Sequence, residues 1–351
     1  MYVSLKDVAA RAGVSFQTAS KVLNGHRGVA SAATVERVQR AAEELGYVPN
    51  ALARGLVRRN SVTVGILVDD LTDSALALFV AGAQTALAGQ GHAVLLTAVG
   101  PGSGAGGALR KLLEHRVDGL LVIAPSIEHD ADAGAALRPD LPLVSLNRLP
   151  GVDAVLLGSD HRSTGQLAAD HLVGLGHRRI ATVVGPRQRD VVRTRLAGFR
   201  DGLAAADVEL PDHRIGESTW SAESAYTAIG AVLDRDPSVT AVFAQNDLMA
   251  SGVLRQLADR DLRVPEQVSV VGCDDLPTSP FLVPALTTVH VPFTETGSRA
   301  AAVLLDLIAG APVARRELLP VHLVERASTR PPPPADKSST VRPAVAKEHQ
   351  A

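Results

Sequence analysis

The 351-residue chain has little cysteine, few aromatic residues and no long apolar run. Its single cysteine, Cys273, cannot form an internal disulfide bond, which excludes a small disulfide-stabilised scaffold. No apolar stretch reaches the roughly 18 residues that a membrane-spanning helix requires. Charged residues at Lys6, Asp7 and Arg11 interrupt the apolar segment that a secretory signal would need. We therefore expect a cytoplasmic protein that has no contact with a membrane.

The sequence also lacks the usual signatures of catalysis. It has no Cys, His, Asp or Glu cluster at metal-ligand spacing and no G-x-S-x-G motif. A G-x-G-x-x-G match at residues 102–107 raises the alternative of a dinucleotide-binding enzyme. This match follows the second predicted strand of the α/β region and lies in an Ala/Gly-rich stretch, which favours a surface loop. We expect no enzyme activity, no cofactor and no metal.

Length and charge indicate two unlike parts. The chain is long enough for about two domains, and 46% hydrophobic residues can form a large core. Residues 1–60 carry nine Lys and Arg against four acidic residues, a net charge of +5, whereas the remainder carries −7. A basic head on an acidic body suggests that the head binds a polyanion. Charge alone leaves a solvated basic face equally open.

From residue 61 onward, continuous apolar strands alternate with helix-period segments, which predicts parallel sheets covered by helices. The expected strands are 61–68, 92–98, 117–124, 141–146, 153–157, 178–184, 239–244 and 267–273. The expected helices are 75–90, 106–116, 161–175, 193–206, 221–235 and 247–260. About 270 residues is large for one open sheet, so we expect two lobes that bind a ligand in the cleft between them.

The head is predicted to contain three helices. Leu5 and Val8 begin an apolar helical repeat that ends at Gly13, and a second helix follows, with Ser15 as a plausible N-cap. A third helix begins near Ser31 and ends at residue 46. Polar residues 17, 18 and 21 share the outer face of the second helix, as in a helix-turn-helix that reads the major groove. A plain helical hairpin is the alternative, and the basic charge favours DNA binding.

These residues resemble the lactose-repressor (LacI/GalR) family. The resemblance begins with residues 4–15 (SLKDVAARAGVS) and with Gln17, Thr18, Ser20 and residues 22–24 (VLN). It continues through residues 44–53 (ELGYVPNALA), 172–177 (LVGLGH), 195–199 (RLAGF), 245–247 (QND) and 270–275 (VVGCDD), so it extends over residues 4 to about 327. The implied fold is an all-α helix-turn-helix head with a two-lobed α/β body like the type I periplasmic binding proteins.

The resemblance implies base reading by Phe16, Gln17 and Lys21, where many relatives carry tyrosine at the first position and arginine at the last. The segment 48–60 corresponds to a hinge helix that orders on DNA and presses Leu56 into the minor groove; an ordinary linker is the alternative. The full predicted DNA-binding set is Ser15, Phe16, Gln17, Thr18, Lys21, Asn24, Asn50, Ala53 and Leu56.

The resemblance also implies a sugar site between the lobes. Trp220 is expected to stack on a sugar ring, although a large ring at such a loop often packs as core. Arg148 is either a ligand contact or part of a structural ion pair, and Asp274 and Asp275 have helix capping as their alternative role. The full predicted effector-binding set is Asp70, Asn147, Arg148, Arg195, Trp220, Asn246, Asp274 and Phe293.

The expected function is a repressor of sugar-utilisation genes that a mono- or disaccharide releases from a palindromic operator. A regulator with a corepressor, or a sugar receptor without DNA function, are the alternatives. Two heads on a palindrome predict a symmetric homodimer. The expected domains are a helix-turn-helix head at 1–47, a hinge or linker at 48–60, an effector-binding and dimerisation body at 61–329, and a disordered tail at 330–351.

Overall fold

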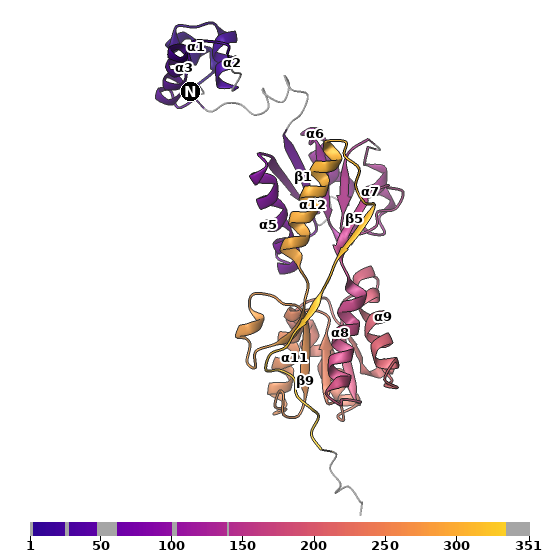
Figure 1. The fold of residues 1–351 in the computed structure, drawn as a ribbon. Helices are drawn as coiled ribbons and strands as arrows, with labels where there is room; N and C mark the ends of the chain where they lie inside the picture. The colour runs from indigo at the N-terminus through magenta and orange to yellow at the C-terminus, as the bar shows by residue number, and fades with distance from the viewer. Residues whose placement is uncertain (1–2, 25–27, 48–61, 100–103, 139, 335–351) are drawn as a thin grey trace, which may run out of the picture.

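The computed structural model describes residues 3–24, 28–47, 62–99, 104–138 and 140–334. They form a small helical head and a body of two lobes (Figure 1). The expected fold class, a helix-turn-helix head with a two-lobed α/β body, is confirmed. Among the described residues, no helix is both long and apolar enough to cross a membrane.

The head consists of α1 (Leu5–Ala12), α2 (Phe16–Leu23) and α3 (Ala32–Glu44). Ser4 and Asp7 form a capping box at the start of α1, and Gly13 ends it in the left-handed conformation with φ +65°. Ser15 and Ser31 cap α2 and α3, as the sequence predicts. All three helices bury small apolar faces against one another, namely Val8, Ala9, Ala12, Ala19, Val22, Val38, Ala41 and Ala42.

The first lobe is a six-stranded parallel sheet in the order β11-β5-β4-β3-β1-β2. Its strands are β1 (Thr63–Val68), β2 (Ala93–Ala98), β3 (Gly119–Ile123), β4 (Leu143–Ser145), β5 (Val155–Ser159) and β11 (Arg316–Leu319). One face packs on α5 (Ser74–Gly89) and α12 (Phe293–Ile308), and the other on α6 (Gly104–Glu114) and α7 (Ala131–Ala135). Burial on both faces explains the continuous apolar strands.

The second lobe repeats this plan in the order β12-β10-β9-β8-β6-β7, with β10 and β12 antiparallel. Its strands are β6 (Ile180–Val184), β7 (Ile215–Glu217), β8 (Ala241–Ala244), β9 (Ser269–Asp274), β10 (Thr287–His290) and β12 (His322–Val324). One face packs on α8 (His161–Gly174) and α9 (Asp190–Ala204), and the other on α10 (Ala222–Arg235) and α11 (Asp247–Asp259). Short 3-10 helices lie at η1 (Pro125–Ile127), η2 (Asp212–Arg214) and η3 (Ser279–Phe281).

The chain passes between the lobes after β5, between β10 and α12, and between β11 and β12 (Figure 1). The sequence did not predict α12, β10, β11 or β12, which build these crossings. Part of the glycine motif at residues 102–107 forms the first turn of α6, which begins at Gly104, two residues before the predicted helix 106–116, so a loop was the wrong prediction for residues 104–105. The packed chain also continues past residue 329, because the Arg330 carbonyl bonds to His177 and Ser269.

Helices α8 and α9 approach closely enough for backbone contact. A methyl group at Gly165 of α8 would overlap the carbonyl of Arg195, and one at Gly198 of α9 would overlap the carbonyl of Arg162. Glycine is therefore required at both positions of this crossing. The close approach fixes the position of Arg195 relative to the sheet.

Candidate DNA-reading face and ligand cleft

Helix α2 presents polar side chains on its free face. The Ser15 hydroxyl accepts a hydrogen bond from the Thr18 amide at 3.1 Å, which fixes the start of the helix. Gln17 and Lys21 are exposed one turn apart, and Phe16, the first residue of α2, is 51% exposed. Asn24 caps the other end, where its side-chain amide donates to the Ser20 hydroxyl at 3.3 Å.

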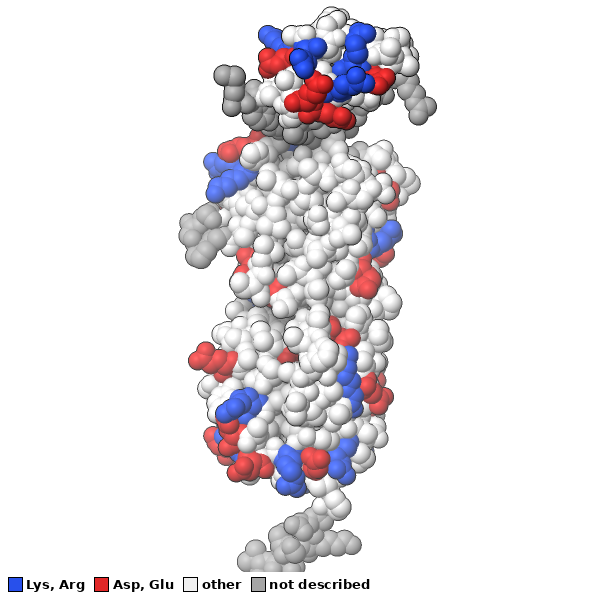
Figure 2. Space-filling view, turned by 90° about the vertical axis from the view of Figure 1, so that its left-hand side faces the viewer, with Lys and Arg blue, Asp and Glu red and all other residues white. Residues whose placement is uncertain are grey.

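The charge of the head is more mixed than the net value suggests. Basic and acidic side chains stand together on the face that Figure 2 shows. Arg11 of α1 pairs with Glu44 of α3 at 2.8 Å, and Arg40 pairs with Glu36 within α3 at 2.7 Å. Exposed pairs of this kind stabilise little. The predicted hinge contacts Asn50, Ala53 and Leu56 lie outside the described residues.

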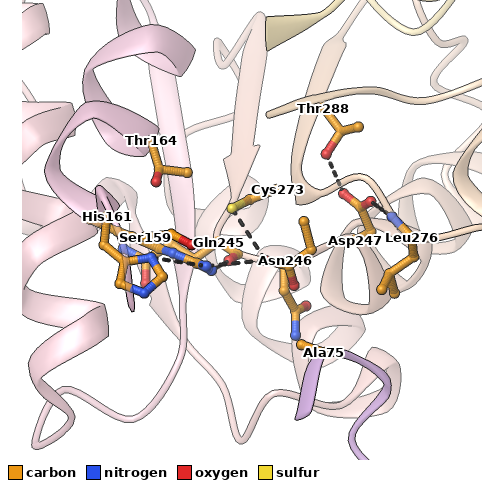
Figure 3. A network of polar contacts seen from close by, with 12 residues as sticks. Ala75, Ser159, His161, Thr164, Gln245, Asn246, Asp247, Cys273, Leu276 and Thr288 are labelled. Atoms are coloured by element: carbon orange, nitrogen blue, oxygen red, sulfur yellow. Dashed lines mark hydrogen bonds and ion pairs between the residues drawn. The ribbon is translucent and has the colours of Figure 1, made fainter. Parts of the chain in front are cut away.

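A buried ion pair lies at the carboxyl ends of the strands in the second lobe. Arg195 of α9 is 3% exposed, and its guanidinium lies 3.0 Å from the Asp274 carboxylate at the end of β9. The guanidinium also donates to the carbonyl of Gln245 and lies 3.4 Å from the His161 imidazole. The Arg195 Nε atom and the Gln245 side-chain oxygen are buried without a partner among the described residues. Figure 3 shows His161, Gln245 and Cys273 converging here.

The electrostatics of this cluster follow from its burial. Burial raises the pKa of Asp274 to about 7, with Arg195 opposing the shift and Asp247 and Asp73 adding to it. Burial also lowers the pKa of His161 to about 3, and Arg195 adds to that effect, so the imidazole is neutral. Because Asp73 caps α5 in the first lobe, its influence on Asp274 shows that charge from both lobes acts on the site.

Asn246 and Asp247 begin α11 beside this pair (Figure 3). The Asn246 side-chain oxygen accepts from the Met249 amide at 2.7 Å, which leaves its amide group for other contacts. Asp247 is 2% exposed and accepts from the Leu276 amide at 2.9 Å. It also accepts from the hydroxyls of Ser279 and Thr288, each at 2.6 Å. The sequence did not single out Asp247, because its partners lie 29 to 41 residues away along the chain.

Trp220 packs partly in the core, and its stacking on a sugar ring stays a prediction. It follows β7 with a positive φ of +70° and is half-buried. Its indole covers the backbone at Gly185, where an added methyl carbon would lie 2.5 Å from the ring. The ring packs on the hydrophobic cluster of Val184, Val192 and Ile215, so part of it belongs to the core.

The remaining predicted ligand residues are dispersed. Asp70 is exposed and bonds its own turn at Thr72, whereas its neighbour Asp69 accepts a hydrogen bond from the Ser126 amide at 2.7 Å. Arg148 is exposed. Phe293 begins α12 and packs against hydrophobic clusters of both lobes. The structure therefore brings Arg195, Asn246, Trp220 and Asp274 to one end of the second sheet, with Asn147 in a separate contact.

Hydrogen bonds around Glu128 join the two lobes and form what we call the Glu128 seam, which the sequence did not reveal. Glu128 of the first lobe is 4% exposed and accepts from the Asp190 amide at the start of α9 and from the Asn147 amide group, each at 2.9 Å. The Arg189 guanidinium donates to the Pro125 carbonyl at 2.7 Å. Burial raises the pKa of Glu128. Its only sequence signal is an acidic residue in the loop after β3.

Glu128, His129 and Asp190 also form a candidate metal cluster, since their ligand atoms lie within 4.8 Å of one another. Two carboxylates and an imidazole suit Zn²⁺. Both oxygens of Glu128 already accept hydrogen bonds, and Asp190 pairs with Arg193. We assign these residues to the contact between the lobes.

Two protein-family models match the chain, one over the head and one over part of the body. Residues 4–50 match bacterial regulatory proteins of the lacI family, and residues 169–329 match the periplasmic binding protein-like domain. The lactose operon repressor of Escherichia coli K12 is 34% identical over 94% of this chain and 91% of its own length. The ribose operon repressor of the same strain is 33% identical over 93% of this chain and 99% of its own length.

Solved structures agree over the whole fold. The lac repressor dimer bound to operator and the anti-inducer ONPF matches with a TM-score of 0.86 and 34% identity, over 94% of this chain and 100% of that one. The complex of the transcriptional regulator CelR with cellobiose matches with a TM-score of 0.70 and 35% identity, over 93% and 99%. From these matches we conclude that the chain belongs to the lacI family of bacterial regulatory proteins and is a DNA-binding transcriptional regulator.

Proposed function

We propose that this protein is a homodimeric repressor that leaves its operator when a small sugar binds between the lobes. The single observation that carries the effector half is the buried Arg195–Asp274 pair at the carboxyl ends of the strands in the second sheet, the end at which Trp220 also lies. A polar pair with unused hydrogen-bonding atoms, at the same end of a sheet as an aromatic ring, suits a hydroxyl-rich ligand. This role places the protein in the cytoplasm, with the DNA.

On the DNA side, α2 enters the major groove as the recognition helix. Gln17 bonds an adenine edge and Lys21 a guanine edge, each contact contributing on the order of 1–3 kcal/mol of discrimination. The hinge residues Asn50 and Leu56 act in the adjacent minor groove. One recognition helix contacts few base pairs, so the operator is a palindrome that binds two heads.

The second lobe offers an apolar surface for the homodimer. Phe281 and Val283, in and after η3, are 82% and 93% exposed, and Leu248 of α11 is 49% exposed. The lac repressor, which shares this fold, is solved as a dimer on its operator. We assign this surface to the contact with the second copy. Asp247 links it to the cleft, because it bonds to Ser279 of η3 and adjoins Asn246.

The effector acts by favouring one arrangement of the two lobes over another. A ligand shifts such an equilibrium only through different affinities for the two states. The Glu128 carboxylate joins the lobes, because it accepts from the Asp190 amide of the second lobe while Asn147 of its own lobe donates to its other oxygen. Sugar bound between Arg195 and Trp220 changes the relative stability of the arrangement that holds the paired hinge segments on DNA.

A thermal-shift screen of mono- and disaccharides tests this proposal. A sugar that raises the unfolding temperature of the full chain is expected to lose this effect in Trp220→Ala and to retain most of it in Trp220→Phe, which keeps an aromatic ring. The same sugar is expected to weaken operator binding; stronger binding would make it a corepressor. A stabilising sugar whose effect is unchanged in Trp220→Ala would contradict the proposed site.

A further inference from the structure

Phe16 is an apolar side chain on a surface that is otherwise polar. It is the first residue of α2 and is 51% exposed, whereas the apolar residues Ala19 and Val22 of the same helix are at least 93% buried. The Ser15 cap, with its oxygen 3.1 Å from the Thr18 amide, fixes the backbone from which the ring projects. The ring therefore stands at the N-terminal end of the helix without a place in the core of the head.

The N-terminal residues of a recognition helix contact base edges in the major groove. A phenyl ring can neither donate nor accept a conventional hydrogen bond. Placed against a polar edge, it would remove water from a base donor or acceptor and give no partner in return. Thymine alone among the four bases carries an apolar group in this groove, its C5-methyl group.

We propose that Phe16 selects a thymine methyl group in each operator half-site, while Gln17 and Lys21 read polar base edges. This inference rests on the proposed function, because it assumes that α2 lies in the major groove. It adds a specificity rule that follows from the exposed ring: the base opposite Phe16 is recognised by its methyl group and not by hydrogen bonding. A cytosine methylated at the same ring carbon satisfies the same rule.

Contact with the sugar-phosphate backbone is the competing role for the ring. A phenyl ring packed on deoxyribose also contributes affinity, but the affinity would not depend on the base. Replacing thymidine by deoxyuridine separates the two roles, because it removes one methyl group and leaves every hydrogen-bonding group of the base in place. The charge and the backbone of the duplex are also unchanged.

The experiment uses the full-length protein and an operator obtained by selection from random duplexes. Each thymidine is replaced singly by deoxyuridine, and the dissociation constant is measured by fluorescence anisotropy at fixed salt. We expect one position per half-site at which the replacement weakens binding ~4-fold, which corresponds to about 0.8 kcal/mol for one buried methyl group. In Phe16→Ala this ratio is expected to fall to about one, as the apolar contact is lost.

Two further variants keep the test decisive. Phe16→Leu retains an apolar side chain and is expected to retain the dependence on the methyl group. Lys21→Ala is expected to weaken binding to thymidine and deoxyuridine operators by the same factor. Because Phe16 is exposed, the variants keep the head folded, which circular dichroism verifies.

The failures of this inference and of the proposed function are distinguishable. Tight operator binding with no deoxyuridine-sensitive position, or a sensitivity that persists in Phe16→Ala, overturns the methyl rule and leaves the repressor function standing. If no duplex is selected and none binds at low salt, both the rule and the proposed function are wrong.

Discussion

Replacing Arg195 by methionine removes the cation that pairs with the buried Asp274 carboxylate. Arg195 and Asp274 are 3% and 6% exposed and lie 3.0 Å apart, so above pH 7, where Asp274 is ionised in the wild type, the substitution leaves the carboxyl group in the interior without its partner or forces it to bind a proton. Breaking a buried pair in this way costs about 3–5 kcal/mol of stability. The Gln245 carbonyl also loses a donor. We expect a loss in this range for the body and no loss for the head, whose core is separate.

Urea denaturation followed by tryptophan fluorescence measures this effect directly, because Trp220 is the sole tryptophan and packs in the second lobe. The control is the double variant Arg195→Met with Asp274→Asn, in which both charges are absent. It is expected to recover part of the lost stability, since no buried charge remains uncompensated. Equal stability of Arg195→Met and wild type, or a double variant weaker than Arg195→Met, would refute this account of the pair.

The pH dependence has a definite sign. Burial raises the pKa of Asp274 to about 7 in the folded protein, above its value near 4 in the unfolded chain. The folded state therefore binds the extra proton between about pH 4 and 7, and this contribution to stability is lost as pH rises through 7. We expect the stability difference between wild type and Asp274→Asn to change across this window. A difference that is constant from pH 4 to 8 would show that Asp274 titrates normally.

Three further substitutions test other parts of the structure. Glu128→Ala leaves two donors of the seam without an acceptor and is expected to cost about 1–3 kcal/mol and to increase the radius of gyration measured by small-angle scattering; an unchanged radius would count against the seam. Gly198→Ala forces a methyl group against a carbonyl and is expected to cost about 1–3 kcal/mol, whereas Gly174→Ala, in open space, is expected to be neutral; equal effects would contradict the tight helix crossing. Phe281→Glu is expected to weaken the dimer in sedimentation, unlike Leu318→Glu on the first lobe; unchanged association would exclude the η3 surface.

Local patterns were sufficient for the head and for most of the body. The serines that cap α2 and α3 and the glycine that ends α1 act within a few residues, so the sequence predicted these helices closely. Most buried strands of both sheets were visible as continuous apolar runs, but β10, with the sequence TTVH, was not. The family motifs in turn identified Arg195, Asn246 and Asp274, which the structure brings to one end of the second sheet.

What the sequence did not predict depends on contacts between distant segments. Strands β11 and β12 are short, and they join sheets whose other strands lie far away in the chain. Glu128 is buried because α9, about 60 residues later, supplies an amide to it from the other lobe. The predicted ligand residue Asp70 bonds Thr72 within its own turn, whereas its neighbour Asp69 reaches Ser126, 57 residues away. Such partners are determined by the packing of the lobes.

The central claim is that the helical head binds duplex DNA and that a sugar in the body controls this binding. Its most direct test is the dissociation constant of the full chain for its selected operator, measured against salt concentration with and without a sugar from the thermal-shift screen. The account predicts a steep fall of affinity with salt, as counterions are released from the phosphates, and a weaker complex when the sugar is present. Binding that is absent at low salt, or an affinity that no stabilising sugar changes, would contradict it.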